Sequence, residues 1–249
     1  MDNRVQTGIP GLDELIKGGL PRGRSILVSG TCGTGKTTFG VQYLVKGITD
    51  YNEAGILVTL EQSCDEIISD MARIGMDMKK CQEDGKLIIV DTSLSKVGIK
   101  DYMGKSKSME TGSVSLLPGE FNIDNMVALV IDAAKKINAK RIVIDSIPAL
   151  DYLINEKHDL RRALIHLNYE LKQQGLTTMI LTEGKDEETI SNYGVEEYIT
   201  DGVIILKINE ALDTRTIKIR KMRVTQHTLK PTTFEFTPNG IKIKTAKGL

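Results

Sequence analysis

The sequence predicts an α/β fold with a mostly parallel sheet flanked by helices, and three observations support this prediction. Short apolar runs that indicate buried strands, at 26–28, 55–60 and 141–146, alternate with segments of helical periodicity. Such alternation indicates a parallel sheet, because a crossover between parallel strands usually contains a helix. The first apolar run leads directly into a glycine-rich loop and a helix. From about residue 203 only strands are expected, which predicts a C-terminal antiparallel extension at the sheet edge.

The glycine-rich loop matches the P-loop pattern, with a buried strand before it and a helix after it. Its glycines let several backbone N–H groups turn toward a phosphate, and the helix N-terminus adds partial positive charge. Lys36 is placed to reach the β- and γ-phosphates, and the Thr37 hydroxyl to bind Mg²⁺. The alternative is a glycine-rich turn without a ligand. We expect a nucleoside triphosphate site formed by Gly30, Thr31, Cys32, Gly33, Thr34, Gly35, Lys36, Thr37 and Thr38.

Carboxylates stand at the ends of several predicted strands. Asp145 closes the strand that begins at residue 141 and is the expected Mg²⁺ partner, because a P-loop enzyme needs an acid at the end of a neighbouring buried strand. Its alternative role is a turn or cap residue. Glu61 follows the strand 55–60 and is the preferred general base, since strand carboxyl ends line the ligand crevice of such sheets. Asp91 and Glu183 also end strands and remain alternatives.

The remaining elements follow from local patterns in chain order. The turn-rich lead-in before residue 21 is expected to pack on the core through Ile9, Leu12, Leu15 and Ile16. Ser63 and Glu66 form a predicted capping box for a helix to about residue 74, and Asp159 is the expected cap of a helix that Gly175 ends. The other expected elements are strand 86–91, helix 122–137, strand 177–182, and strands 203–208, 216–222, 233–236 and 241–243, the last after an Asn239-Gly240 turn.

Composition narrows the function classes. The formal net charge is zero and aromatic residues are 4% with no Trp, which gives no global basic field and few stacking platforms for single-stranded nucleic acid. The three cysteines, one of them Cys32 in the P-loop, are odd in number and form no CxxC pair, which indicates a reducing compartment. We find neither a signal peptide nor an apolar run long enough for a bilayer. The expectation is one cytoplasmic domain, residues 1–249, without a membrane partner.

Two segments keep two interpretations each. Residues 93–121 are polar and rich in glycine and lysine, and they form either a solvated surface loop or a binding loop. The basic run 220–223 is either the solvated face of an edge strand or a set of charges presented to the phosphates of a neighbouring subunit. Sequence physics alone favours the solvated face.

Stretches spread over the whole chain also match one known family, at residues 8–13, 18–21, 29–37, 58–61, 144–146, 171–183, 193–198 and 221–227. The chain resembles the KaiC family of RecA-like P-loop NTPases, and it is similar to a single one of the two KaiC domains. The resemblance implies ATP as the nucleotide and a homo-oligomeric ring, usually a hexamer, with ATP between subunits.

The resemblance also implies roles for individual residues. Glu61 matches the first of two paired catalytic glutamates, whereas the second is Gln62 here, which can orient water but cannot accept its proton. Lys221 and Arg223 match residues that reach the neighbouring subunit's nucleotide, with Thr225 and His227 at the same interface. The positions of the family's autophosphorylated Ser-Thr pair are Glu197 and Tyr198 here, so autokinase activity is not expected.

Three functions therefore stand. The preferred one is a slow Mg²⁺-dependent ATPase in a homo-oligomeric ring that signals its nucleotide state to an unidentified protein partner. The second is a DNA-binding recombinase paralogue in which 93–121 or 184–194 faces DNA. The third is a nucleotide sensor that barely hydrolyses ATP, which Gln62 would favour.

Overall fold

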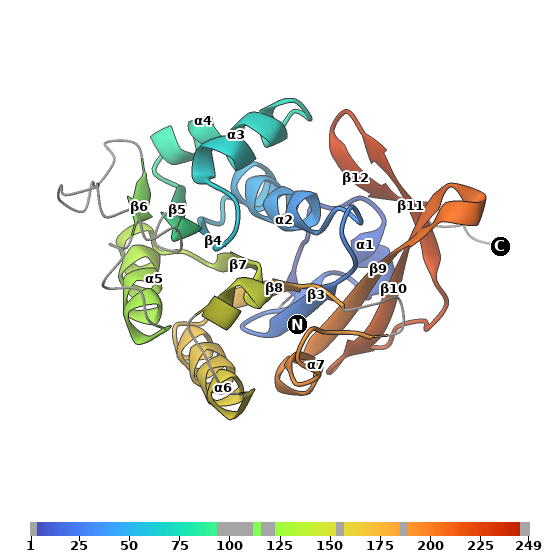
Figure 1. Cartoon of the computed structure of the whole chain (residues 1–249). Coiled ribbons are helices and arrows are strands. Elements are labelled where there is room, and N and C mark those ends of the chain that lie inside the picture. Colours follow the sequence, from blue (N-terminus) through green and yellow to red (C-terminus); the bar gives the residue numbers. More distant parts are fainter. Residues whose placement is uncertain (1–3, 94–111, 116–122, 153–156, 185–188, 245–249) are drawn as a thin grey trace.

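A computed structural model describes residues 4–93, 112–115, 123–152, 157–184 and 189–244, with side chains at nearly all of these positions. Its centre is a ten-stranded sheet in the order β12-β11-β10-β9-β3-β8-β7-β4-β5-β6 (Figure 1). A short separate ribbon pairs the chain start with the segment before the sheet. The strands are β1 (Arg4–Val5), β2 (Leu20–Pro21), β3 (Ser25–Ser29), β4 (Gly55–Thr59), β5 (Leu87–Asp91), β6 (Ser113–Ser115), β7 (Arg141–Asp145), β8 (Thr177–Thr182), β9 (Gly202–Asn209), β10 (Thr214–Met222), β11 (Thr232–Thr237) and β12 (Gly240–Ile243).

Helices cover both faces of the sheet. In Figure 1, α2, α3 and α4 lie on one side of the central strands, and α5 and α6 lie on the other. The helices are α1 (Leu12–Leu15), α2 (Lys36–Tyr51), α3 (Cys64–Ala72), α4 (Met78–Glu83), α5 (Ile123–Ile137), α6 (Lys157–Gln173) and α7 (Glu196–Ile199), with 3-10 turns at Ile147–Tyr152 and Glu210–Leu212. The predicted α/β class, with helices on both faces, is confirmed.

Strand alternation divides the core between the two faces. In β4, Leu57 belongs to the hydrophobic cluster under α2, whereas Ile56 and Val58 belong to the cluster under α5 and α6. Successive side chains of a strand point to opposite faces, so a strand covered on both sides must be apolar throughout. This is why the central strands read as continuous apolar runs.

The switch from parallel to antiparallel pairing occurs at β9. This strand pairs in parallel with β3 on one side and antiparallel with β10 on the other. The antiparallel extension therefore begins at β10, one strand later than the sequence predicted. The β11–β12 hairpin closes with Thr237 opposite Gly240, at the predicted turn.

Helix α2 packs against β7 through two glycines. A Cβ at Gly40 would come within 2.8 Å of Val143, and one at Gly47 within 2.4 Å of the buried Arg141. Real Cβ atoms do not approach that closely, so these positions require glycine for packing. The helix that starts in the P-loop is thereby held against the strand that ends at Asp145.

Most predicted elements are confirmed, with a few differences. The capping box at Ser63 forms as expected, with the Glu66 N–H donating to the Ser63 hydroxyl and the Ser63 N–H donating to the Glu66 carboxylate. Helix α6 begins at Lys157, so Asp159 lies inside the helix and the predicted cap is wrong. The short helices α4 and α7 were not predicted. Of the loop 93–121, only Ser93 and residues 112–115 are described, and 113–115 form β6 beside β5. Among the described residues, no helix is long and apolar enough to cross a bilayer.

Candidate active site

The carboxyl ends of the parallel strands and the P-loop enclose one cavity of about 490 Å³. Strand ends β4, β7 and β8 contribute carboxylates, and the start of α2 contributes the P-loop lysine and threonines. Its lining residues are Cys32, Gly33, Gly35, Lys36, Thr37, Thr38, Glu61, Gln62, Asp70, Met71, Asp145, Ser146, Glu183 and Phe236. Residues separated by more than a hundred positions in the chain thus meet at the predicted crevice.

The P-loop places its lysine at the floor of this cavity. Gly35 precedes α2 with a φ of 93°, a left-handed conformation that favours glycine. Lys36 is buried, and its Nζ donates to the carbonyl oxygens of Gly30 at 2.9 Å and Thr31 at 3.0 Å. The same Nζ lies 3.0 Å from a carboxylate oxygen of Glu183. The ammonium group is therefore fixed by acceptors on two sides while its helix position faces the cavity.

Thr37 and Asp145 form the second pair. The Thr37 hydroxyl donates to Asp145 Oδ2 at 2.7 Å, across the gap between α2 and β7. Burial, with a smaller contribution from the Glu61 charge, raises the pKa of Asp145 to about 6, against the opposing effect of the Thr37 hydrogen bond. A hydroxyl and a carboxylate oxygen at this separation suit Mg²⁺, which usually takes one or two protein ligands beside substrate phosphates.

Glu61 is oriented by the next residue of the Asp145 strand. The Ser146 hydroxyl donates to Glu61 Oε1 at 2.6 Å, and the Leu60 N–H donates to the Asp145 carbonyl at 2.7 Å. These two bonds join the ends of β4 and β7 and set the distance between the two carboxylates. Glu61 is exposed to the cavity, so water has access to it.

The structure separates the two alternative bases. Asp91 is absent from the cavity lining and accepts hydrogen bonds from the N–H of Cys64, at the start of α3, and from Ser93. It is an anchor for a helix start. Glu183 does line the cavity, but it is paired with Lys36 rather than held for water.

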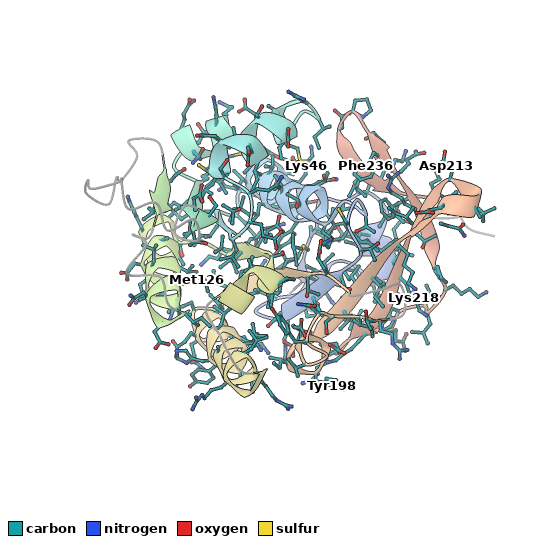
Figure 2. The ribbon with its side chains drawn as sticks, viewed as in Figure 1. Lys46, Met126, Tyr198, Asp213, Lys218 and Phe236 are labelled. Atoms are coloured by element: carbon teal, nitrogen blue, oxygen red, sulfur yellow. The ribbon has the colours of Figure 1, made fainter. Side chains whose placement is uncertain are left out.

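Phe236 is a cavity residue that the sequence analysis missed. It reaches the P-loop from β11, and a Cβ on Gly35 would come within 2.5 Å of its ring. Figure 2 shows it where the β11–β12 hairpin approaches α2. Arg215 packs over the ring at 5.0 Å from the centroid, and Phe234 contacts it edge-on. The available signal was its position in a strand of alternating aromatic residues, but nothing in the sequence paired that strand with the P-loop.

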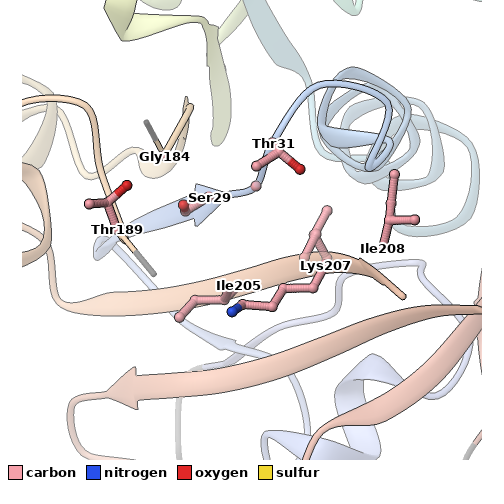
Figure 3. A pocket seen from close by; sticks show the side chains of 9 residues that line it. Ser29, Thr31, Gly184, Thr189, Ile205, Lys207 and Ile208 are labelled. Atoms are coloured by element: carbon pink, nitrogen blue, oxygen red, sulfur yellow. The ribbon is translucent and has the colours of Figure 1, made fainter. Parts of the chain in front are cut away.

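A smaller recess lies beside the start of the P-loop, between the end of β3, strand β9 and the residues that flank 185–188 (Figure 3). Ser29, Thr31, Thr189 and Lys207 are among its lining residues, as are Gly30 and Gly184. Its volume of about 20 Å³ admits a water molecule and nothing larger. Gly30 and Thr31 face this recess. Thr34 is buried, and the other residues of the predicted phosphate loop line the large cavity.

The predicted interface residues lie elsewhere. Lys221, Arg223, Thr225 and His227 do not line the cavity of their own chain. A bulge between Ile219 and Lys221 shifts the alternation of β10, so Met222 is buried and Lys221 points to the opposite face. There Lys221 Nζ donates to the carbonyls of Glu197 at 3.1 Å and Thr200 at 2.6 Å. Burial and the Arg223 charge lower the pKa of Lys221. Arg223 is 57% exposed, and His227 is half-buried in the loop after β10, with its Nδ1 3.2 Å from the Thr228 carbonyl.

The family model described as the KaiC ATPase matches residues 5–248 of this chain. The chain belongs to the KaiC ATPase family. Its predicted resemblance to that family is confirmed.

Named relatives agree with this assignment. The circadian clock oscillator protein KaiC of Parathermosynechococcus lividus is 37% identical over 243 residues, which is 96% of this chain and 42% of the relative. KaiC of Synechococcus elongatus is 36% identical over 96% of this chain and 44% of the relative. The chain thus spans less than half the length of these curated relatives.

A solved structure matches over its full length. The KaiC-like protein of the hyperthermophilic archaeon Pyrococcus horikoshii OT3 has a TM-score of 0.82 and 39% identity, and the match covers 98% of this chain and 100% of that one. The RecA-like fold with its antiparallel extension is therefore that of a KaiC-like protein, as the sequence predicted.

Proposed function

We propose that this chain binds ATP with Mg²⁺ and hydrolyses it slowly in a homo-oligomeric, hexameric ring. The observation that carries the proposal is the convergence of Lys36, Thr37, Asp145 and Glu61 on one cavity at the P-loop. Membership of the KaiC ATPase family supports ATP as the nucleotide. We further propose that residues 1–249 act as one ATPase domain.

Each cavity residue has a separate task in this proposal. Lys36 and the P-loop N–H groups bind the phosphates and stabilise the charge that develops on the γ-phosphate. Thr37 and Asp145 hold the Mg²⁺ ion, which when bound neutralises phosphate charge. Glu61, oriented by Ser146, takes a proton from the attacking water.

The rim of the cavity supports a nucleotide base as the outer part of the ligand. Phe236 is 42% exposed and lies at the edge of the P-loop, with Arg215 on its ring. An aromatic face of this kind stacks on any base and adds affinity without reading its hydrogen-bonding edge. We therefore assign Phe236 to affinity rather than to discrimination between ATP and GTP.

The segment after β10 supports the ring. Lys221 and Arg223 carry charge that the cavity of their own chain does not use, and we propose that they act with Thr225 and His227 at the nucleotide of the next subunit. A site completed by two subunits makes hydrolysis depend on assembly. The ring would then report its nucleotide state to a protein partner through its conformation.

Light scattering with and without ATP–Mg²⁺, run beside phosphate release, tests the proposal. We expect wild-type mass to rise with ATP–Mg²⁺ and phosphate to appear slowly. Lys36→Ala should lose phosphate release, whereas Lys79→Ala, which removes an exposed lysine from α4, should keep both the mass increase and phosphate release. A wild-type monomer that releases phosphate at the same specific rate at every protein concentration would refute the ring.

A further inference from the structure

The loop after β10 holds a backbone conformation that its sequence disfavours. Val224 has a φ of 54° and its side chain is 74% exposed. A β-branched residue in the left-handed region is strained, and it persists only where surrounding contacts fix it. No apolar packing fixes Val224, because its side chain faces solvent. The restraint must come from its backbone and from its neighbours.

Arg4 supplies that restraint from the other end of the chain. Its NH2 group donates to the Val224 carbonyl at 3.0 Å, and its NH1 group donates to the Thr225 hydroxyl at 2.7 Å. NH1 also lies 3.2 Å from the Gly19 carbonyl and 3.4 Å from the Ile16 carbonyl. One guanidinium therefore joins the lead-in to the loop at two consecutive residues.

The lead-in is itself a rigid support. Strand β1 pairs with β2, so that Arg4 lies opposite Pro21, and the segment between them packs Ile9, Leu12 and Ile16 into the core. A side chain on Gly19 would collide with the Val5 carbonyl at 2.4 Å, which shows how closely the two strands lie. Arg4 is thus fixed at its base before it reaches the loop.

Asp201 anchors the residue on the other side of Val224. The Arg223 N–H donates to the Asp201 carbonyl at 2.9 Å, and the Arg223 guanidinium lies 3.8 Å from the Asp201 carboxylate. Burial alone would raise the pKa of Asp201, but hydrogen bonds from Lys172 and Ser25 and the charges of Lys172 and Arg24 lower it, so the carboxylate is ionised at neutral pH. Arg223 is held at its backbone, and Val224 and Thr225 are held by Arg4.

We propose that Arg4 is a positioning residue: it fixes the turn at Val224 and Thr225 so that Arg223 and Thr225 of one subunit meet the nucleotide of the next. This inference rests on the proposed function. Arg4 itself touches no nucleotide in this arrangement. Its planar fork serves two acceptors on adjacent residues, which a single ammonium group cannot match. Because a misplacement of about 1 Å can cost roughly 100-fold in rate, a residue outside the cavity can control turnover.

Mixing two inactive variants tests where Arg4 acts. Arg4→Ala keeps an intact P-loop but presents a damaged loop, whereas Lys36→Ala presents an intact loop but has no working P-loop. We expect Arg4→Ala alone to lose roughly tenfold or more in turnover. The two variants are mixed in equal amounts before ATP–Mg²⁺ is added. In about a quarter of the head-to-tail interfaces, Arg4→Ala then supplies the intact P-loop and Lys36→Ala supplies the intact loop. Turnover should therefore rise to about a quarter of wild type.

Two reference mixtures separate the inference from the function on which it rests. Arg223→Ala with Lys36→Ala tests the shared site itself, and Arg4→Ala with Arg223→Ala should show no recovery because both damage the same half. Recovery with Arg223→Ala but not with Arg4→Ala would mean that Arg4 acts within its own subunit, and the inference would fail alone. No recovery in either mixture with Lys36→Ala would overturn the shared site and the inference together.

Conservative and distant substitutions complete the design. Arg4→Lys keeps the charge and serves as the second variant if Arg4→Ala does not fold; it should recover in the same mixture and lose less turnover alone. Thr225→Val removes one acceptor of Arg4 and should complement Lys36→Ala in the same way. Arg73→Ala removes an exposed arginine after α3 and should leave turnover unchanged. Wild-type turnover in Arg4→Ala would refute the positioning role.

Discussion

The cavity at the P-loop and the segment 221–227 differ in what each finds within its own chain. In the cavity, side chains from α2, β4, β7 and β8 contact one another directly, at 2.6–3.0 Å. In the segment, Lys221, Arg223 and Thr225 contact backbone and side chains of α7, Asp201 and Arg4, none of which lines the cavity. The fold brings the cavity residues into contact with one another, whereas it fixes the conformation of segment 221–227 without bringing it to the cavity.

This difference separates two ways in which a fold can position functional groups. The groups that line the cavity are positioned by the sheet, because the ends of neighbouring strands are joined by hydrogen bonds. In the proposed ring, segment 221–227 acts only after assembly and therefore needs a defined conformation before its target arrives. Preorganisation of this kind lowers the entropy cost of forming the interface.

Removal of the arginine in the segment should have the largest effect. Arg223→Ala is expected to lower phosphate release by roughly 10³-fold, because an arginine supplied by a neighbour stabilises the charge of the transition state. Phosphate release at saturating ATP measures this. Arg220→Ala, which removes an exposed arginine at the bulge of the same strand, should stay near wild type. Equal losses in both variants would make the segment a general basic surface and remove the contrast with the cavity.

Loss of the base within the cavity should have the next largest effect. Glu61→Gln keeps the Ser146 hydrogen bond but cannot accept a proton, so turnover should fall by about 10²-fold while ATP affinity is kept. Fluorescent-nucleotide binding measured beside phosphate release separates the two quantities. Gln62→Ala is the control and should change turnover only slightly. Unchanged turnover in Glu61→Gln would rule out Glu61 as the base.

Truncation at the rim should affect binding more than chemistry. Phe236→Ala removes the ring next to Gly35, and KM for ATP should rise by about tenfold with kcat nearly unchanged, since stacking of a base is worth roughly 1–3 kcal/mol. Steady-state kinetics resolve the two constants. Phe234→Leu, a change to the buried neighbour, should alter stability rather than KM. A fall in kcat with constant KM would place Phe236 among the groups that act on the reaction.

The last prediction concerns the stability of the fold and its dependence on pH. Since burial raises the pKa of Asp145 from 3.8 to about 6, its ionised form destabilises the fold. This group's favourable contribution is present below about pH 4 and is lost as pH rises through 6. Asp145→Asn should therefore raise the unfolding free energy by roughly 2–3 kcal/mol at pH 8 and by little near pH 4. Urea denaturation of nucleotide-free protein measures it, with the exposed Asp70→Asn as control. A gain that does not depend on pH would assign the effect to packing.

Much of the fold was predictable because the strands are buried on both sides. Apolar runs such as 26–28 and 55–60 fit strands that are buried on both faces, and β8 has the predicted bounds. The P-loop, Asp145 and Glu61 were predictable for a related reason: parallel strands end at the same edge, so residues that close them must meet. The sequence could not exclude Asp91 as an alternative base to Glu61, because its hydrogen bond to the backbone of α3 is visible only in the structure.

The rest depended on pairings between distant strands. Phe236 reaches the P-loop only because β12 and β11 fold back over the start of α2, and no local pattern specifies that contact. Arg4 could not be linked to Thr225 from a sequence that separates them by almost the whole chain. The bulge that turns Lys221 toward α7 also breaks the alternation from which its direction would have been inferred. Long-range register, rather than propensity, was the missing information.

The two glycines of α2 limit how this chain can change over evolutionary time. Neither Gly40 nor Gly47 lines the cavity, yet a methyl group on either would force Val143, the Arg141 side chain or the helix itself to shift. Any movement of the helix away from β7 would separate Thr37 from Asp145, whose oxygens lie 2.7 Å apart. A survey of random variants should therefore recover inactive but soluble proteins at these positions. Interior glycines outside the cavity can thus be as intolerant of substitution as the P-loop lysine.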